Sequence, residues 1–170
     1  VLSILQHPTI DQLKQKIVFC VGLKTKELLN ENGFTVEAYT GYAEDLAEII
    51  TLVYSDESFT FFSGNLRRDT LPEMLSENEI TFNEIKVYDT TLTPQKISEK
   101  VDGILFFSPS AVTSYLKKNT LTNEKLFCIG NTTADSLRAV LSETKIKNIK
   151  TAYQPSVDNV IEQVIEYYNK

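Results

Sequence analysis

The stretch Lys16-Ile-Val-Phe-Cys-Val-Gly-Leu-Lys-Thr25 decides the fold because it occurs twice in the chain. Its second copy is Lys125-Leu-Phe-Cys-Ile-Gly-Asn-Thr-Thr133, with Cys, Gly and Thr in register. In each copy a continuously apolar run, typical of a strand buried in a parallel sheet, leads into a glycine turn and a helical pattern. A period of roughly 110 residues is too long for a solenoid repeat and indicates two copies of one α/β domain.

Short apolar runs alternate with helical patterns along the rest of the chain. This βαβα order predicts parallel sheets with helices on both faces. Strands are expected at residues 17–21, 35–39, 60–63, 84–88, 103–108, 126–129 and 149–152. Helices are expected at residues 24–32, 43–52, 67–76, 94–100, 111–118, 132–141 and 157–168.

The composition excludes several classes of protein. The 170 residues carry a net charge of −6, which argues against nonspecific nucleic-acid binding because that needs a basic surface. No apolar run approaches the roughly 20 residues that span a bilayer. Cys20 and Cys128 each lie inside an apolar run, so we expect reduced core residues and no disulfide. His7 is the only histidine, which argues against a Ser-His-Asp triad and a multi-histidine metal site.

The beginning of the chain matches a later segment. Val1-Leu-Ser-Ile-Leu5 resembles Val112-Thr-Ser-Tyr-Leu116, and it starts without Met in what looks like the middle of a helix. If the two segments correspond, a Phe-Ser-Pro-Ser-Ala-like strand end is expected before Val1. We therefore interpret the sequence as one whose N-terminal part is missing.

Four segments could carry chemistry. The first is Ser63-Gly-Asn-Leu-Arg-Arg-Asp-Thr-Leu-Pro72, where a strand ends and a helix begins with two arginines. Free N–H groups there, together with Arg67 and Arg68, could bind a carboxylate or phosphate. The alternative is a solvated first turn with a salt bridge to Asp69.

The other three segments also lie at strand ends. Phe106-Phe-Ser-Pro-Ser-Ala-Val112 and Ile129-Gly-Asn-Thr-Thr-Ala134 each join a strand to a helix, and their polar side chains either cap that helix or reach a ligand. The natural caps are Ser108 or Ser110 in the former and Asn131 or Thr132 in the latter. Ile85-Lys-Val-Tyr-Asp-Thr-Thr91 places Tyr88 at a strand end, where a half-buried structural tyrosine is the alternative.

Taken in this order, the four segments resemble the uroporphyrinogen-III synthase family over essentially the whole chain. The resemblance implies two similar α/β domains of flavodoxin-like topology, one inserted into the other and joined by a two-strand connector. On this pattern residues 1–84 form the inserted domain without its first βα unit, and residues 85–90 form a connector strand. Residues 91–170 then form the outer domain without its N-terminal strand and helix.

The resemblance also implies an activity. Such a cyclising lyase converts hydroxymethylbilane, a linear tetrapyrrole, into uroporphyrinogen III in haem biosynthesis, with loss of water and inversion of ring D. It implies a monomeric cytoplasmic enzyme with no cofactor, metal, nucleic-acid or membrane partner. Tyr88 matches the tyrosine proposed to assist departure of the hydroxyl. The positions that match substrate-binding sites are Asn65, Arg67, Arg68, Ser108, Lys125, Gly130, Thr132 and Thr133.

Two other functions stay open at this point. One is a non-catalytic module of the same fold that binds a small anion or tetrapyrrole. The other is a phosphate- or nucleotide-binding enzyme, which is disfavoured because no Gly-x-Gly-x-x-Gly or P-loop lysine motif occurs. An acidic protein should not steer a polycarboxylate substrate over long range, so we expect local N–H groups, hydroxyls and a few cations to bind it.

Overall fold

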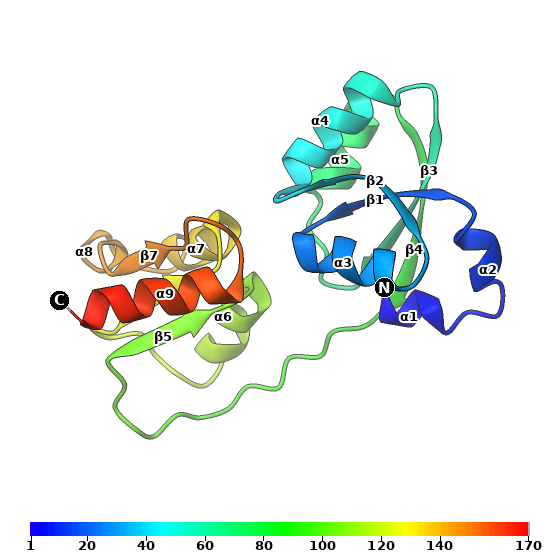
Figure 1. Cartoon of the computed structure of the whole chain (residues 1–170). Coiled ribbons are helices and arrows are strands. Elements are labelled where there is room, and N and C mark those ends of the chain that lie inside the picture. Colours follow the sequence, from blue (N-terminus) through cyan, green and yellow to red (C-terminus); the bar gives the residue numbers. More distant parts are fainter. Residues whose placement is uncertain (170) are drawn as a thin grey trace. The chain divides into compact units, whose positions relative to one another are not determined.

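The computed structural model describes residues 1–169 and separates two compact units, Val1–Thr90 and Thr91–Lys170 (Figure 1). Every pair of neighbouring strands in both units is parallel. The predicted α/β class with parallel sheets is therefore confirmed. Each unit is described by itself below.

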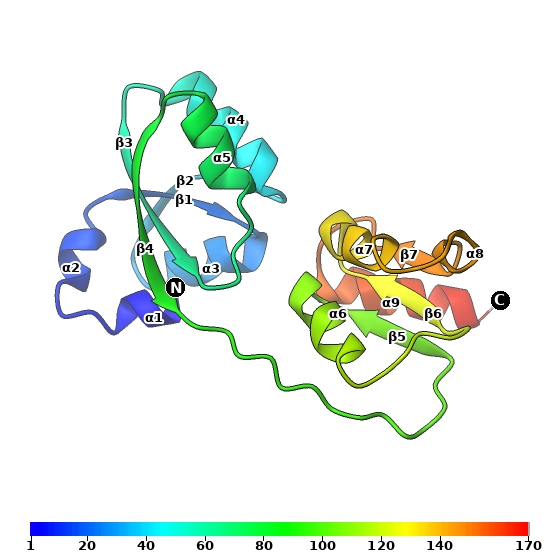
Figure 2. The same cartoon turned by 180° about the vertical axis from the view of Figure 1, so that it is seen from behind.

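Unit 1, residues 1–90, contains two parallel strand pairs and five helices. β1 (Ile17–Val21) pairs with β2 (Thr35–Thr40), and β3 (Ser58–Gly64) pairs with β4 (Thr81–Tyr88), as Figure 2 shows from behind. The helices are α1 (Leu2–Leu5), α2 (Ile10–Leu13), α3 (Leu23–Glu31), α4 (Ala43–Val53) and α5 (Thr70–Glu77).

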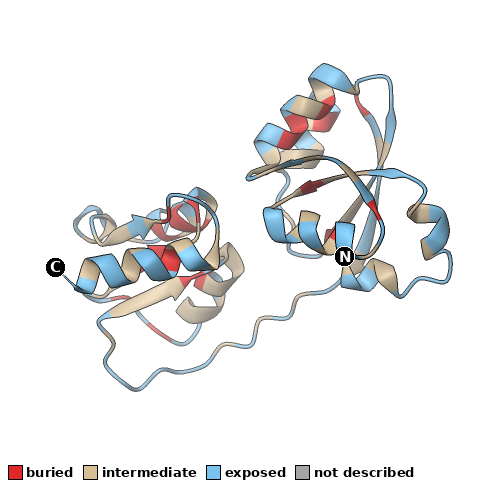
Figure 3. Cartoon of the chain, in the orientation of Figure 1, coloured by how far each residue is buried: buried red, intermediate tan, exposed pale blue. Residues whose placement is uncertain are grey.

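Side chains from β1 point alternately into two hydrophobic clusters. Phe19 packs with the apolar faces of α4 and α5 and with β3 and β4, whereas Cys20 packs with Leu29 of α3 and residues of α1 and α2. Both faces of this strand are thus covered by helices, which explains why its sequence is continuously apolar. Figure 3 shows the buried positions of unit 1 along α4 and the strands beside it.

Two helices of unit 1 end in the same backbone motif. After α3, Gly33 lies at φ +83°, and the N–H of Phe34 donates to the carbonyl of Leu29 over 3.1 Å. After α5, Glu79 lies at φ +58°, and Ile80 donates to Leu75 over 2.9 Å. These are Schellman caps, in which a left-handed residue turns the chain and satisfies a helix-end carbonyl.

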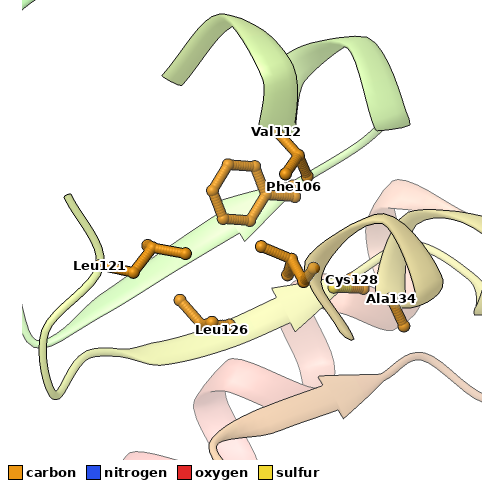
Figure 4. Close-up of a cluster of buried hydrophobic side chains, with 7 residues drawn as sticks. Phe106, Val112, Leu121, Leu126, Cys128 and Ala134 are labelled. Atoms are coloured by element: carbon orange, nitrogen blue, oxygen red, sulfur yellow. The ribbon is translucent and has the colours of Figure 1, made fainter. Parts of the chain in front are cut away.

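Unit 2, residues 91–169, has one three-stranded parallel sheet in the order β5 (Gly103–Phe106), β6 (Lys125–Cys128), β7 (Ile149–Thr151). Its helices are α6 (Pro109–Leu116), α7 (Asn131–Arg138), α8 (Glu143–Ile146) and α9 (Val157–Tyr168). Successive residues of β6 again face opposite helical layers. Cys128 packs with α6 and α7 (Figure 4), whereas Phe127 packs with Val160 of α9.

The two copies of the repeat fold alike at their centre. β1 and β6 each bury a cysteine and are followed by a glycine that is the N-cap of the next helix, Gly22 before α3 and Gly130 before α7. The prediction that Asn131 or Thr132 caps α7 is therefore wrong, because Asn131 is already the first helical residue.

One predicted helix is absent. Residues 94–100 are irregular, and the reason is a buried amide: Asn119 accepts a hydrogen bond from the Ile97 N–H and donates to the Gln95 carbonyl, both over 2.8 Å. The N–H of Ile97 and the carbonyl of Gln95 are thereby engaged in tertiary hydrogen bonds and not in a helix. The short helices α2 and α8 were not predicted, because four residues are too few to show a 3.6-residue period.

The segment assigned to a connector belongs to unit 1. Residues 85–88 are the end of β4, and Ile85 and Lys86 pair with Phe62 and Ser63 of β3. The irregular stretch that follows leads from Tyr88 to β5 (Figure 1). Among the described residues no helix is long and apolar enough to cross a membrane.

Candidate functional site

The carboxyl ends of β3 and β4 lie at the same edge of unit 1, because the two strands are parallel. The turn that leaves β3, residues 63–68, thereby meets Tyr88, the last residue of β4. The register shifts by one residue between Ser63 and Gly64, so that Gly64 lies opposite Tyr88. The first and fourth predicted motifs are thus brought together by strand pairing.

The aromatic ring of Tyr88 packs against the Cα of Gly64. A Cβ built on Gly64 would lie 2.4 Å from two ring carbons of Tyr88 and 2.8 Å from its hydroxyl oxygen. The tyrosine is nevertheless 53% exposed. Within residues 1–169 no hydrogen bond to its hydroxyl is formed, so the phenol is available to donate to a ligand.

Asn65 links the turn to the chain after Tyr88. Its Nδ2 donates to the Thr90 carbonyl over 3.2 Å, and its Oδ1 accepts from the Thr90 N–H over 2.6 Å. Its own N–H donates to the Tyr88 carbonyl over 3.3 Å. The side-chain amide of Asn65, which was predicted to bind a ligand, is therefore hydrogen-bonded to the backbone. Its bonds to Thr90 extend the pairing of β3 with β4 beyond the last strand residues.

Arg67 lies between two carboxylates. Its Nη2 donates to Oε2 of Glu84 over 2.7 Å, its Nε donates to the other oxygen of the same carboxylate, and its Nη1 donates to Asp69. Ser63 Oγ donates to Glu84 over 2.6 Å. The hydrogen bonds from Arg67 and Ser63 hold the pKa of Glu84 at about 2, well below its ordinary value, and those to Glu84 and Asp69 raise the pKa of Arg67.

This arrangement differs from an open anion site. The Asp69 salt bridge that was the alternative interpretation is present, and Glu84 is a second partner that the sequence motifs did not indicate. A bidentate pair of this kind uses the directional donors of the guanidinium, so Arg67 anchors the turn to β4. It also explains why α5 begins at Thr70, three residues later than predicted. The only sequence signal for Glu84 was an acidic residue inside a strand pattern.

In unit 2 the carboxyl ends of β5 and β6 form a second edge, where α6 and α7 begin. Ser108 caps α6 as predicted, since its Oγ accepts from the Ala111 N–H over 3.1 Å. Its hydroxyl also lies 3.0 Å from that of Ser110. The Ile129 N–H donates to the Phe106 carbonyl over 3.0 Å, which holds the two strand ends together.

α7 begins without a side-chain cap, because its N-cap is Gly130. Thr132 lies in its first turn and is partly exposed, whereas Thr133 is 2% exposed and belongs to the interior. Ser108, Gly130 and Thr132 are therefore brought to one edge of unit 2. Thr133 supports that edge from within.

Lys125 is at the other end of the sheet. It is the first residue of β6, whereas Gly130 lies two residues beyond the last. Its Nζ lies 3.0 Å from Oδ1 of Asn148 and 5.5 Å from the centre of the Tyr167 ring. Within unit 2, Lys125 therefore lies at the opposite end of the sheet from Ser108 and Thr132.

A hollow of about 370 Å³ in unit 2 is lined by residues of β5, β6 and α9, among them Leu105, Phe127 and Tyr168, and contains none of the predicted site residues. Across residues 1–169 no cluster of three or more His, Cys, Asp or Glu side chains could hold a metal ion.

Comparison with known proteins assigns the chain to a family. A sequence model described as "Uroporphyrinogen-III synthase HemD" matches residues 3–162, which is nearly the whole chain and includes every predicted site residue. The chain belongs to the uroporphyrinogen-III synthase HemD family. The resemblance inferred from the four motifs is thereby confirmed.

Individual relatives of the uroporphyrinogen-III synthase HemD family agree. The chain is 27% identical over 144 residues to the uroporphyrinogen-III synthase of Chlorobaculum parvum (strain DSM 263 / NCIMB 8327). That alignment covers 75% of this chain and 58% of the relative, so the chain spans little more than half of its length. A crystal structure of uroporphyrinogen-III synthetase from Helicobacter pylori 26695 matches with a TM-score of 0.68, 21% identity, and coverage of 97% of this chain and 76% of that one. This likeness shows the fold.

Proposed function

We propose that this protein is a uroporphyrinogen-III synthase, which cyclises hydroxymethylbilane to uroporphyrinogen III with loss of water and inversion of ring D. The family match supports this proposal. The structural observation that carries it is Tyr88, an exposed phenol at the carboxyl edge of β4 with no hydrogen-bond partner among residues 1–169. An unengaged donor is what departure of a hydroxyl group requires.

In the proposed reaction the Tyr88 phenol donates a proton as the bond between the terminal methylene carbon and its oxygen breaks. The hydroxyl leaves as water, and ring A becomes an electron-poor azafulvenium cation, whose charge balances that of the phenolate. Ring D then attacks through its substituted α-carbon, and the resulting spiro species fragments and recloses with ring D inverted. The proton released when the pyrrole rings are restored returns to the phenolate.

Substrate carboxylates need donors, and the edge of unit 2 offers them. The first turn of α7 begins at Gly130 without a side-chain cap, and helix N-termini favour anions through their N–H groups and dipole. We propose that Ser108 and Thr132 add hydroxyl donors at this edge. Arg68, on unit 1, is the proposed cation of the β3 turn, whereas Asn65 and Arg67 are assigned to holding that turn.

The contacts of the remaining predicted residues support structural assignments. We propose that Thr133 supports the start of α7 and that Lys125 stabilises the packing of β6 against Tyr167. We also propose a monomeric, cytoplasmic protein. The two buried, unpaired cysteines support a reducing compartment, and gel filtration with light scattering tests the monomer.

A coupled assay on the full natural protein tests the proposed function. Hydroxymethylbilane is supplied continuously, and the porphyrin products are oxidised and separated as isomers I and III. We expect the III isomer, since unassisted closure gives the I isomer. Formation of the I isomer alone, at the rate measured without the protein, would refute the synthase assignment. Tight tetrapyrrole binding without turnover would favour a non-catalytic module of the same fold.

The variant Tyr88→Phe tests the role of the phenol. Loss of a general acid typically costs about 100-fold or more in rate, so we expect kcat to fall by about this factor with little change in thermal stability. Tyr168→Phe is the matched control, because Tyr168 is 48% exposed and lies beside Gly103, the first residue of β5, at the end of the unit 2 sheet opposite to Ser108 and Gly130. An unchanged kcat in Tyr88→Phe would remove the phenol from the mechanism.

A further inference from the structure

We propose that Gly64 and Asn65 are positioning residues that hold the ring and the main chain of Tyr88 in the orientation in which its hydroxyl is delivered to the substrate. This inference rests on the proposed function, because it assigns a catalytic purpose to contacts around Tyr88. It concerns residues that touch the tyrosine and not the substrate.

The glycine at position 64 is not required by its own backbone. Within residues 1–169 the positive-φ residues are Gly22, Gly33 and Glu79, so Gly64 has a conformation open to any amino acid. What excludes a side chain is the ring of Tyr88, which would lie 2.4 Å from a Cβ at this position. Atoms this close cannot be accommodated, so any other residue at position 64 must displace the ring.

This contact determines where the phenol points. Tyr88 is more than half exposed, and an exposed aromatic side chain normally samples several rotamers. Here the Cε2–Cζ end of the ring lies close to the bare main chain of Gly64, and this contact restricts the ring without engaging its hydroxyl in a hydrogen bond. The hydroxyl is thereby positioned while it stays free to donate.

Asn65 restrains the main chain at Tyr88 and just after it. Its N–H donates to the Tyr88 carbonyl, and its amide group both donates to and accepts from Thr90. Without these hydrogen bonds, the backbone after the end of β4 would not be bonded to the turn that follows β3. The pair of contacts to Thr90 therefore extends the ordered β3–β4 edge beyond Tyr88.

A double-mutant cycle tests the role of Gly64 in the full natural protein. Misplacing a catalytic group by about 1 Å can cost about 100-fold in rate, so Gly64→Ala is expected to lower kcat by roughly ten- to hundredfold with KM nearly unchanged. In a Tyr88→Ala background the same substitution should change the residual kcat less than twofold, because the ring that it displaces is gone. Equal losses in both backgrounds, or no loss in either, overturn the inference.

Asn65 has a matched control on the same strand pair. Asn83 also joins β3 to β4 through a side-chain hydrogen bond, accepted from Thr60 over 2.7 Å, but it lies far along the strand from Tyr88. We expect Asn65→Ala to lower kcat about tenfold or more and Asn83→Ala to leave it unchanged. If both variants lose activity in proportion to their loss of thermal stability, Asn65 is only structural and the inference fails for it.

A measurement without turnover separates this inference from the proposed function. The Gly64 α-protons lie against the Tyr88 ring, so their NMR resonances should be shifted by the ring current, and the shift should disappear in Tyr88→Ala. Absence of the shift overturns the contact even if the protein is an active synthase. If the shift is present but the wild type forms only the I isomer, the contact stands, and the proposed function and the catalytic purpose given to Gly64 are both overturned.

Discussion

The two Schellman caps of unit 1 provide a paired test of how backbone conformation contributes to stability. Gly33 and Glu79 occupy equivalent left-handed positions after α3 and α5, but only Gly33 lacks a side chain there. We predict that Glu79→Gly stabilises the protein and that Gly33→Ala destabilises it. The comparison isolates the backbone because both residues sit in the same hydrogen-bonding pattern.

The expected magnitudes follow from two opposing terms. A side chain in the left-handed region costs about 1–2 kcal/mol, and the greater freedom of glycine in the unfolded chain costs about 0.5–1 kcal/mol. Glu79→Gly should therefore gain about 0.5–1 kcal/mol. A Cβ on Gly33 meets only Lys14 Cδ at 3.9 Å, so Gly33→Ala creates no clash and should lose about the same amount.

Differential scanning calorimetry measures both effects. For a domain of this size 1 kcal/mol corresponds to about 4–8 °C in Tm, so we expect a rise of about 2–8 °C for Glu79→Gly and a similar fall for Gly33→Ala. Glu79→Gln is the control, because it removes a negative charge from the C-terminal end of α5 but keeps the Cβ. If Glu79→Gln raises Tm as much as Glu79→Gly does, helix-dipole electrostatics and not φ is responsible, and the reasoning is refuted.

Two further predictions follow from the perturbed ionisations. Because the folded pKa of Glu84 is lowered from 4.5 to about 2 by Arg67 and Ser63, its contribution to stability is complete above about pH 4.5 and is lost as the pH falls towards 2. Glu84→Gln should therefore lower the urea midpoint at pH 6 and converge with the wild type near pH 2; a constant difference over this range would contradict the contact. Burial raises the pKa of Cys128 to about 11 and also raises that of Cys20, so a disulfide reagent at pH 8 should modify both thiols slowly in the native protein and rapidly in guanidinium chloride. Fast native modification of Cys128 would show that its environment is open.

Local periodicity predicted many of the elements and the family motifs. The predicted bounds of β1 and α9 agree with the structure, because a continuously apolar five-residue run and a twelve-residue amphipathic pattern are each recognisable without knowledge of their neighbours. The cap at Ser108 was also predicted, since it depends on a bond between residues only three positions apart.

The site could be predicted only as a set of residues. Sequence motifs indicated that Asn65, Arg67 and Tyr88 matter, but the contacts that define their roles join residues far apart in the chain. Arg67 meets Glu84 across 17 positions, and Asn65 meets Thr90 across 25. No local pattern encodes such pairs, because they depend on the register in which β3 and β4 align.

The same distinction explains the errors. The helix expected at residues 94–100 is absent because Asn119, more than twenty residues away, binds the backbone of that segment. The sequence by itself determined the α/β class and the family, since these depend on spacing and residue type along the chain. Only the tertiary structure decided that Gly64 lies against the ring of Tyr88 and that Arg67 is held by two carboxylates, because strand pairing brings these groups within atomic contact.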